Sequence, residues 1–145
     1  MLSIELPKDK KIYFASDNHL GAPTAAESKP REAKFVQWLD NIKADAGAIF
    51  LLGDLFDFWF EYKTVVPKGF VRTLGKLAEL RDSGIPIYFF VGNHDLWMDD
   101  YFETELGIPV YRRPLEVECA GKRFLIGHGD GLGPGDKGYK RMKKV

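Results

Sequence analysis

Four short runs of apolar residues in this chain each lead into a polar motif, and this pattern constrains the fold more than any other feature. The runs cover residues 12–15, 49–52, 85–91 and 124–126. Short apolar runs bounded by turn residues predict buried strands. The motifs that follow them are Asp17-Asn18-His19, Gly53-Asp54-Leu55-Phe56-Asp57, Gly92-Asn93-His94-Asp95 and Gly127-His128-Gly129-Asp130. Acidic, histidine and asparagine side chains therefore gather at strand ends, as in a metal site built on a sheet.

Two amphipathic segments separate the first three apolar runs. Pro30 opens one segment, in which Phe35, Leu39 and Ile42 recur at helical spacing before Gly47. The other runs from residue 67 to residue 84. Alternating strands and helices predict parallel pairing through right-handed crossovers, in a sheet covered on both faces. The polar motifs then share the carboxyl edge of that sheet, where ligands of open α/β sheets bind.

The chain after the third run has a different pattern. We expect a short helix over residues 96–106, followed by strands at 110–112, 115–119 and 123–126, the last two forming a hairpin. These three strands would begin a second, more antiparallel sheet. The predicted fold class is α/β with α+β character, a two-sheet sandwich flanked by helices. At 145 residues the chain is long enough for one domain, and we expect residues 1–145 to form a single one.

Composition restricts the classes of function. The 21 basic and 21 acidic residues balance, which argues against a general nucleic-acid binder. Five basic residues between 137 and 145 fit a solvated helix start better than an anion-binding patch. The single Cys119 cannot form an intramolecular disulfide, and residues 1–11 lack an apolar core of signal-peptide length. We expect a cytoplasmic protein without an integral membrane segment.

The first two motifs carry the donors of a cation site. Asp17 and His19 lie two residues apart, so on an extended segment both side chains face one cation. Carboxylate with imidazole suits Mn, Fe or Zn better than Ca. Asp54 follows a buried strand, where a carboxylate is costly unless it meets a cation or several donors. Asp57 is either a residue that orients a ligand or an ordinary cap, and each motif taken alone also fits a simple turn.

The later motifs carry candidate catalytic groups. Asn93 offers a neutral amide oxygen to a metal, and His94 is a candidate general acid whose ring Asp95 would hold. His128 lies between two glycines, so the backbone can approach it closely. The loop from Asp130 to Asp136 is rich in glycine and binds substrate or forms a plain surface turn.

Taken together, the motifs D-x-H, G-D-x-x-D, G-N-H-D and G-H-G resemble those of the calcineurin-like metallophosphoesterases, over essentially the whole chain. That resemblance implies a pair of mixed sheets flanked by helices and a site for two divalent ions. By resemblance, Asp17 and His19 bind the first ion, Asp54 bridges, and Asn93 and His128 bind the second. Manganese is the expected metal, with Zn or Fe as alternatives.

Within this family the motif stretches are similar to the UDP-2,3-diacylglucosamine diphosphatases of lipid A biosynthesis, in a Bacteroidetes-type lineage. The resemblance implies hydrolysis of a pyrophosphate bond in a nucleotide-linked lipid, giving UMP and a lipid monophosphate. His94 and Asp95 would be catalytic, and Asn93, His94 and Asp136 would contact the substrate. It also implies peripheral contact with the cytoplasmic face of the inner membrane. Aromatic residues after the motifs, such as Phe58 and Trp97, are candidates for lipid contact or for ordinary core packing.

Two departures from the family pattern keep alternatives open. Many of these diphosphatases carry Arg where His94 stands, so a phosphoesterase acting on nucleotides, phosphoproteins or small esters is the second hypothesis. The family closes its site with a later G-H-x-H motif, whereas this sequence has three histidines in all. We therefore expect an N-terminal fragment of a longer protein, with an incomplete second sheet and little activity by itself. An inactive metal-binding module is the third hypothesis.

Overall fold

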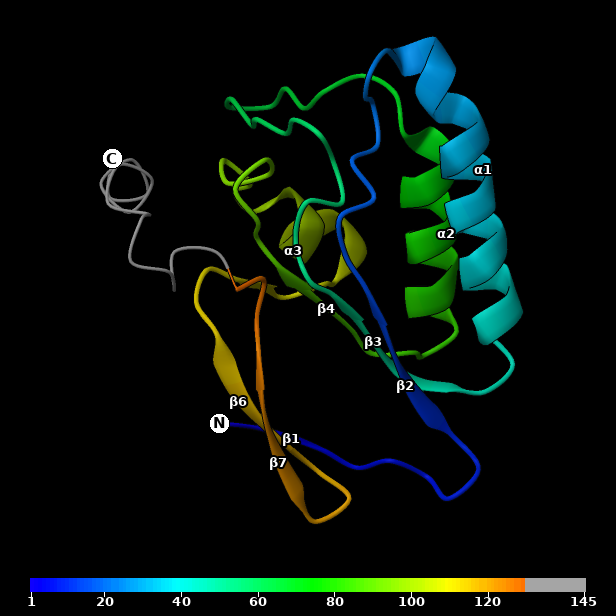
Figure 1. Cartoon of the computed structure of the whole chain (residues 1–145), viewed down its shortest axis with the longest axis vertical. Helices are drawn as coiled ribbons and strands as arrows, with labels where there is room; N and C mark the ends of the chain where they lie inside the picture. Colours follow the sequence, from blue (N-terminus) through cyan, green and yellow to red (C-terminus); the bar gives the residue numbers. More distant parts are fainter. Residues whose placement is uncertain (130–145) are drawn as a thin grey trace.

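Two sheets and three helices make up residues 1–129, the part of the chain that the computed structural model describes (Figure 1). The elements follow in the order β1 (Leu2–Ile4), β2 (Lys11–Ala15), α1 (Ala25–Ile42), β3 (Ala46–Leu51), α2 (Val71–Asp82), β4 (Ile87–Phe90), α3 (Tyr101–Leu106), β5 (Val110–Tyr111), β6 (Leu115–Cys119) and β7 (Lys122–Ile126). No helix in these residues is long and apolar enough to cross a membrane.

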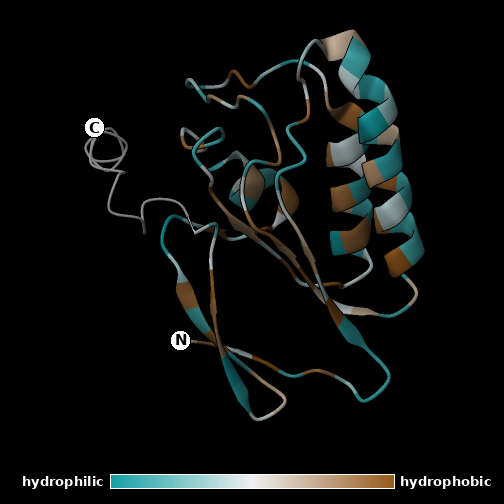
Figure 2. Cartoon of the chain, viewed as in Figure 1, coloured by the Kyte–Doolittle hydropathy of each residue, from teal (hydrophilic) through white to brown (hydrophobic). Residues whose placement is uncertain are grey.

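The first sheet has the order β2-β3-β4-β5, and all of its strands are parallel. This confirms the predicted alternation of strands and helices. Helices α1 and α2 pack side by side along this sheet (Figure 1). Both helices are banded in hydrophilic and hydrophobic colours in Figure 2, as amphipathic helices are. Their buried residues join the sheet in the larger core, which includes Leu39, Ile49, Leu77 and Phe89.

The second sheet has the order β1-β6-β7, in which β1 and β6 are parallel and β6 and β7 are antiparallel. Ala120 and Gly121 join the hairpin with φ of 52° and 75°. Two central residues with positive φ give a mirror-image turn whose twist matches that of the strands. A smaller core lies between the sheets, where Phe50 and Phe90 meet Val117 and Ile126. Strand β3 therefore buries side chains on both of its faces.

The strand predictions were wrong about two strands and about part of the burial, since Phe14 of β2 and Phe124 and Leu125 of β7 are exposed. Strand β1 was not predicted, because its three residues carry too short a pattern to identify. Strand β5 belongs to the first sheet, paired in parallel with β4, and not to the second sheet. Helix α3 forms a short crossover between these two strands, and a crossover of this kind returns the chain in the parallel direction.

The helices also begin elsewhere than predicted. Helix α1 begins at Ala25, where the Thr24 hydroxyl accepts a hydrogen bond from the Glu27 N–H at 3.1 Å, and Pro30 lies inside it. Helix α2 begins at residue 71 and not at residue 67. Helix α3 begins at residue 101 and not at residue 96, because Glu61 accepts hydrogen bonds from the N–H groups of Asp99 and Tyr101 and holds that segment as a loop.

Candidate metal centre

The loops that leave β2 and β3 run side by side and are joined by backbone hydrogen bonds. The N–H of Asp17 donates to Gly53 O at 3.1 Å, and the N–H of His19 donates to Asp54 O at 2.9 Å. Since β2 and β3 are parallel neighbours, both loops begin at the same edge of the sheet. The first two motifs are therefore brought together by the sheet, as their position after strands predicted.

Three candidate ligands have a strained backbone. Asp17, His19 and Asp54 have φ of 59°, 46° and 52°, in the left-handed region that residues other than glycine seldom adopt. Each costs roughly 1 kcal/mol relative to an ordinary conformation. Such strain persists only where the surrounding structure holds it, and it occurs often at functional sites. Here it directs successive side chains of two loops toward one point.

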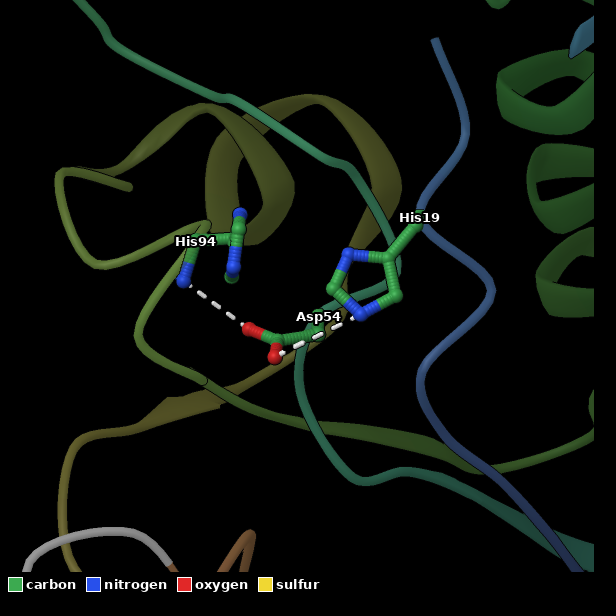
Figure 3. A group of neighbouring side chains, drawn as sticks. All are labelled: His19, Asp54 and His94. Atoms are coloured by element: carbon green, nitrogen blue, oxygen red, sulfur yellow. Dashed lines mark hydrogen bonds and ion pairs between the residues drawn. The ribbon is translucent and has the colours of Figure 1, made fainter. Parts of the chain in front are cut away.

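Two groups of candidate ligands share the Asp54 carboxylate. One consists of His19, Asp54 and His94 (Figure 3), and the other of Asp17, Asp54 and His128; within each group the ligand atoms lie within 4.8 Å of one another. The Nε2 atoms of His128 and His19 lie 3.3 Å and 3.8 Å from the same Asp54 oxygen. Asp54 is buried, with 3% of its surface exposed. A carboxylate common to two groups has the position that a bridging ligand requires.

The three imidazoles are anchored through Nδ1. His128 Nδ1 donates to Leu52 O at 2.6 Å, and His94 Nδ1 donates to Asp57 O at 2.8 Å. His19 Nδ1 lies 3.2 Å from Asp57 Oδ1. A histidine that binds a metal commonly donates its other ring N–H to a carbonyl or carboxylate, which fixes the tautomer and leaves a free lone pair. The donor set therefore fits divalent metal ions.

The structure agrees with one suggested role of Asp57, orienting a ligand, and contradicts the role suggested for Asp95. Asp95 was predicted to hold the His94 ring, but Asp57 does so, through its carbonyl oxygen and through Oδ1 at 3.5 Å. The Asp95 carboxylate is fully buried and accepts hydrogen bonds from the N–H groups of Gly92, Asp54 and Leu55 at 2.7, 3.2 and 3.0 Å. Burial raises the pKa of this carboxyl, and the hydrogen bonds from the backbone of Gly92 and Asp54 oppose the rise. Asp95 thus ties the end of β4 to the backbone of Asp54.

Two glycines allow the ends of β3 and β4 to approach so closely. A methyl group on Gly92 would lie 2.6 Å from the Asp54 nitrogen and would overlap its carboxylate. A methyl group on Gly53 would lie 2.7 Å from both Gly92 N and His128 Nδ1, and φ of Gly53 is 90°. In both motifs, glycine is required for space beside the ligands.

The remaining residues that the sequence predicted for the site include Asn93, Asp136, Phe58 and Trp97. Asn93 is exposed on the same loop as His94, and its side chain makes no hydrogen bond within residues 1–129. Asp136, Asp130 and the basic residues 137–145 lie outside the described residues. Phe58 and Trp97 are 59% and 42% exposed, with ring centroids 6.2 Å apart.

A third acidic group, formed by Glu61, Asp99 and Asp100, lies apart from these motifs. Glu61 accepts hydrogen bonds from Trp59 Nε1 at 2.9 Å and from two backbone N–H groups at the start of α3. These bonds explain the glutamate as a structural residue that sets the beginning of a helix.

Comparison with known proteins gives matches over most of this chain. The family described as "Calcineurin-like phosphoesterase" matches residues 10–140. A UDP-2,3-diacylglucosamine hydrolase of Porphyromonas gingivalis is 51% identical over 120 residues, which are 83% of this chain and 46% of that protein. Proteins of the same name from Vibrio vulnificus and Aeromonas hydrophila are 34% and 31% identical over 91% of the chain, covering 52% and 53% of their own lengths. The chain spans about half the length of the curated relatives it matches.

Proposed function

Because the chain belongs to the calcineurin-like phosphoesterase family, we propose that it is part of a metal-dependent hydrolase that cleaves the pyrophosphate bond of UDP-2,3-diacylglucosamine. The products are UMP and a lipid monophosphate, as lipid A biosynthesis requires. The observation that carries this proposal is the 51% identity with the P. gingivalis UDP-2,3-diacylglucosamine hydrolase over 120 residues. The family match over residues 10–140 spans all four motifs.

We propose two divalent ions at this centre, manganese first, with zinc or iron as alternatives. Asp17 and His19 would hold one ion, Asn93 and His128 the other, and Asp54 would bridge them. The position of Asp54 in both groups of candidate ligands supports the bridging role. The 3.7 Å between His19 Nε2 and Asp17 Oδ1 supports placing these two on one ion, although the two groups themselves pair Asp17 with His128 and His19 with His94. Ions bound there would supply Lewis-acid polarisation of a phosphoryl oxygen and activation of water.

The protein's own groups would position the reacting phosphate. His94 donates Nδ1–H to Asp57 O, so Nε2 is the atom left to exchange a proton with the leaving oxygen. Asn93, His94 and Asp136 are the proposed substrate contacts. Asp95 acts indirectly in this proposal, since its carboxylate holds the backbone of Asp54 and not the His94 ring.

The proposed substrate joins a nucleotide to a lipid, so the protein would work at the cytoplasmic face of the inner membrane as a peripheral protein. Phe58 follows the second motif directly, Trp97 lies two residues after the third, and both side chains are exposed. Aromatic rings are favoured at the boundary between water and lipid. Their place in the sequence just after two of the motifs, and the 6.2 Å between their ring centroids, support contact with the lipid part of the substrate.

We also propose that residues 1–145 form one domain of a longer protein. His19, His94 and His128 are the only imidazoles in this sequence. Further ligands for two ions would come from outside these 145 residues. The full-length natural protein is therefore the form in which activity should be measured.

The proposal is tested by incubating the full-length protein and Mn²⁺ with UDP-2,3-diacylglucosamine, and separately with bis(p-nitrophenyl) phosphate. We expect release of UMP from the first substrate, and its loss in Asp54→Asn but not in Asp82→Asn, a control at the exposed end of α2. Turnover of the aryl phosphate without UMP release would favour a phosphoesterase of other specificity. Turnover of neither substrate would contradict both.

A further inference from the structure

One arginine of helix α1 forms hydrogen bonds with the loop that carries Asp17 and His19. Arg31 Nε donates to Asn18 O at 3.0 Å, and Nη2 donates to His19 O at 2.8 Å and to Ala22 O. Three backbone carbonyl groups of residues 18–22 thus converge on one guanidinium. Arg31 belongs to none of the four motifs, and nothing in its sequence position predicts this role.

A second contact from the same helix holds the loop. The N–H of Gly21 donates to the Ser28 hydroxyl at 2.7 Å, and Ser28 is buried with 3% of its surface exposed. Ser28 and Arg31 lie three residues apart, so both face the loop from one side of α1. Together they bind the Gly21 N–H and the carbonyl oxygens of residues 18, 19 and 22, which the loop turns toward the helix.

The strained conformation explains why these contacts matter. With Asp17 and His19 at positive φ, the backbone turns so that the following carbonyl groups point to one place, where their dipoles repel one another. A planar guanidinium presents several N–H donors in a fixed fork and offsets this repulsion. The contacts therefore stabilise the backbone from which the Asp17 carboxylate and the His19 imidazole reach Asp54.

We propose that Arg31, assisted by Ser28, is a positioning residue for the metal ligands Asp17 and His19. This inference depends on the proposed function, in which those two side chains hold an ion. If the positive charge of Arg31 acted instead by repelling the metal ion, replacing Arg31 would raise the metal affinity. The two effects are therefore separable by measurement.

The test uses the full-length protein and Mn²⁺ binding, followed through the electron paramagnetic resonance signal of free Mn²⁺. We expect Arg31→Ala to lower the affinity for one of two ions by about 10- to 100-fold, the range for groups that orient metal ligands. Arg31→Lys should recover only part of this, because one ammonium cannot replace the fork. Ser28→Ala should give a smaller loss. Arg72→Ala is the matched control, since that exposed arginine makes no side-chain hydrogen bond within residues 1–129.

Thermal unfolding of the metal-free variants separates positioning from general stability. Unchanged Mn²⁺ affinity in Arg31→Ala, with or without a lower unfolding midpoint, would overturn the proposal, as would a rise in affinity. A wild-type protein that binds no Mn²⁺ would contradict the proposed metal site first, and this inference with it. If the metal site exists but Arg31 has no positioning role, wild type and Arg31→Ala will bind two ions with equal affinity.

Discussion

Replacing Gly92 by alanine tests whether the close approach of β3 and β4 builds the metal centre. The added methyl carbon would lie 2.6 Å from Asp54 N, whereas ordinary contacts of such an atom begin at 3.4 Å. The two strand ends would have to separate by roughly 0.8 Å, which corresponds to overpacking of a close-packed site. That shift would move the Asp54 carboxylate away from the imidazoles and strain the hydrogen bond from Gly92 N to Asp95.

The cost follows from these two contacts. Overpacking of a core costs about 1–3 kcal/mol. Weakening a hydrogen bond to a charged acceptor adds about 1.5–3 kcal/mol. We therefore expect Gly92→Ala to lower the free energy of unfolding by about 2.5–6 kcal/mol, a large share of the 5–15 kcal/mol typical of a domain. Mn²⁺ affinity should fall as well, because Asp54, the proposed bridging ligand, would be displaced.

Urea unfolding of the metal-free full-length protein measures the first effect, and Mn²⁺ titration measures the second. Gly75→Ala is the matched control, since Gly75 lies inside α2 with nothing within 4 Å of the added methyl group. This substitution should stabilise the protein by about 0.5–1 kcal/mol, as alanine does in a helix. If Gly92→Ala unfolds at the wild-type urea concentration and binds Mn²⁺ equally well, the reasoning from close approach is refuted.

Three further predictions concern the core of the site, the helix surface and the metal. Asp95→Asn is almost isosteric but presents an NH₂ group to a backbone N–H, so urea unfolding should show a loss of about 3 kcal/mol; a loss below 1 kcal/mol would show that these bonds contribute little. Hydrogen bonds from Lys76 lower the pKa of Asp40 and of Glu79, so their stabilisation is present at neutral pH and is lost as pH falls through the depressed native values. Lys76→Met should therefore be less stable than wild type at neutral pH, and the difference in free energy of unfolding should shrink as pH falls below about 4. A difference independent of pH in acid unfolding curves would contradict this. Mn²⁺ at one hundred times its dissociation constant should stabilise the protein by about 2.7 kcal/mol, reversed by a chelator, and an unfolding midpoint indifferent to both would argue against a site in the folded state.

Local sequence patterns determined a large part of this fold. Residues such as Leu39 and Leu77 recur at helical spacing and are buried in α1 and α2, as amphipathic periodicity predicts. Three apolar runs became β2, β3 and β4. Strands β3 and β4 are largely buried, as near-continuous apolar residues in a parallel sheet predict, whereas β2 lies at the sheet edge and is partly exposed. The position of Asp17 and Asp54 at one sheet edge follows from this topology alone.

The tertiary structure alone decided which partner each polar side chain takes. Asp57 lies against His19 and His94, and Asp95 against the backbone of Asp54, although sequence adjacency had paired Asp95 with His94. Adjacent residues on a loop often point in different directions, so adjacency does not predict contact.

Long-range contacts set the remaining features of the centre. His128 bonds to Leu52 across 76 residues, and Arg31 reaches His19 O from a helix outside every motif. Such contacts depend on strand register and helix packing, which no local pattern encodes. Local residue patterns therefore predicted the candidate ligands and the edge where they gather, whereas the folded arrangement of β3, β4 and α1 decided how each of these side chains is held.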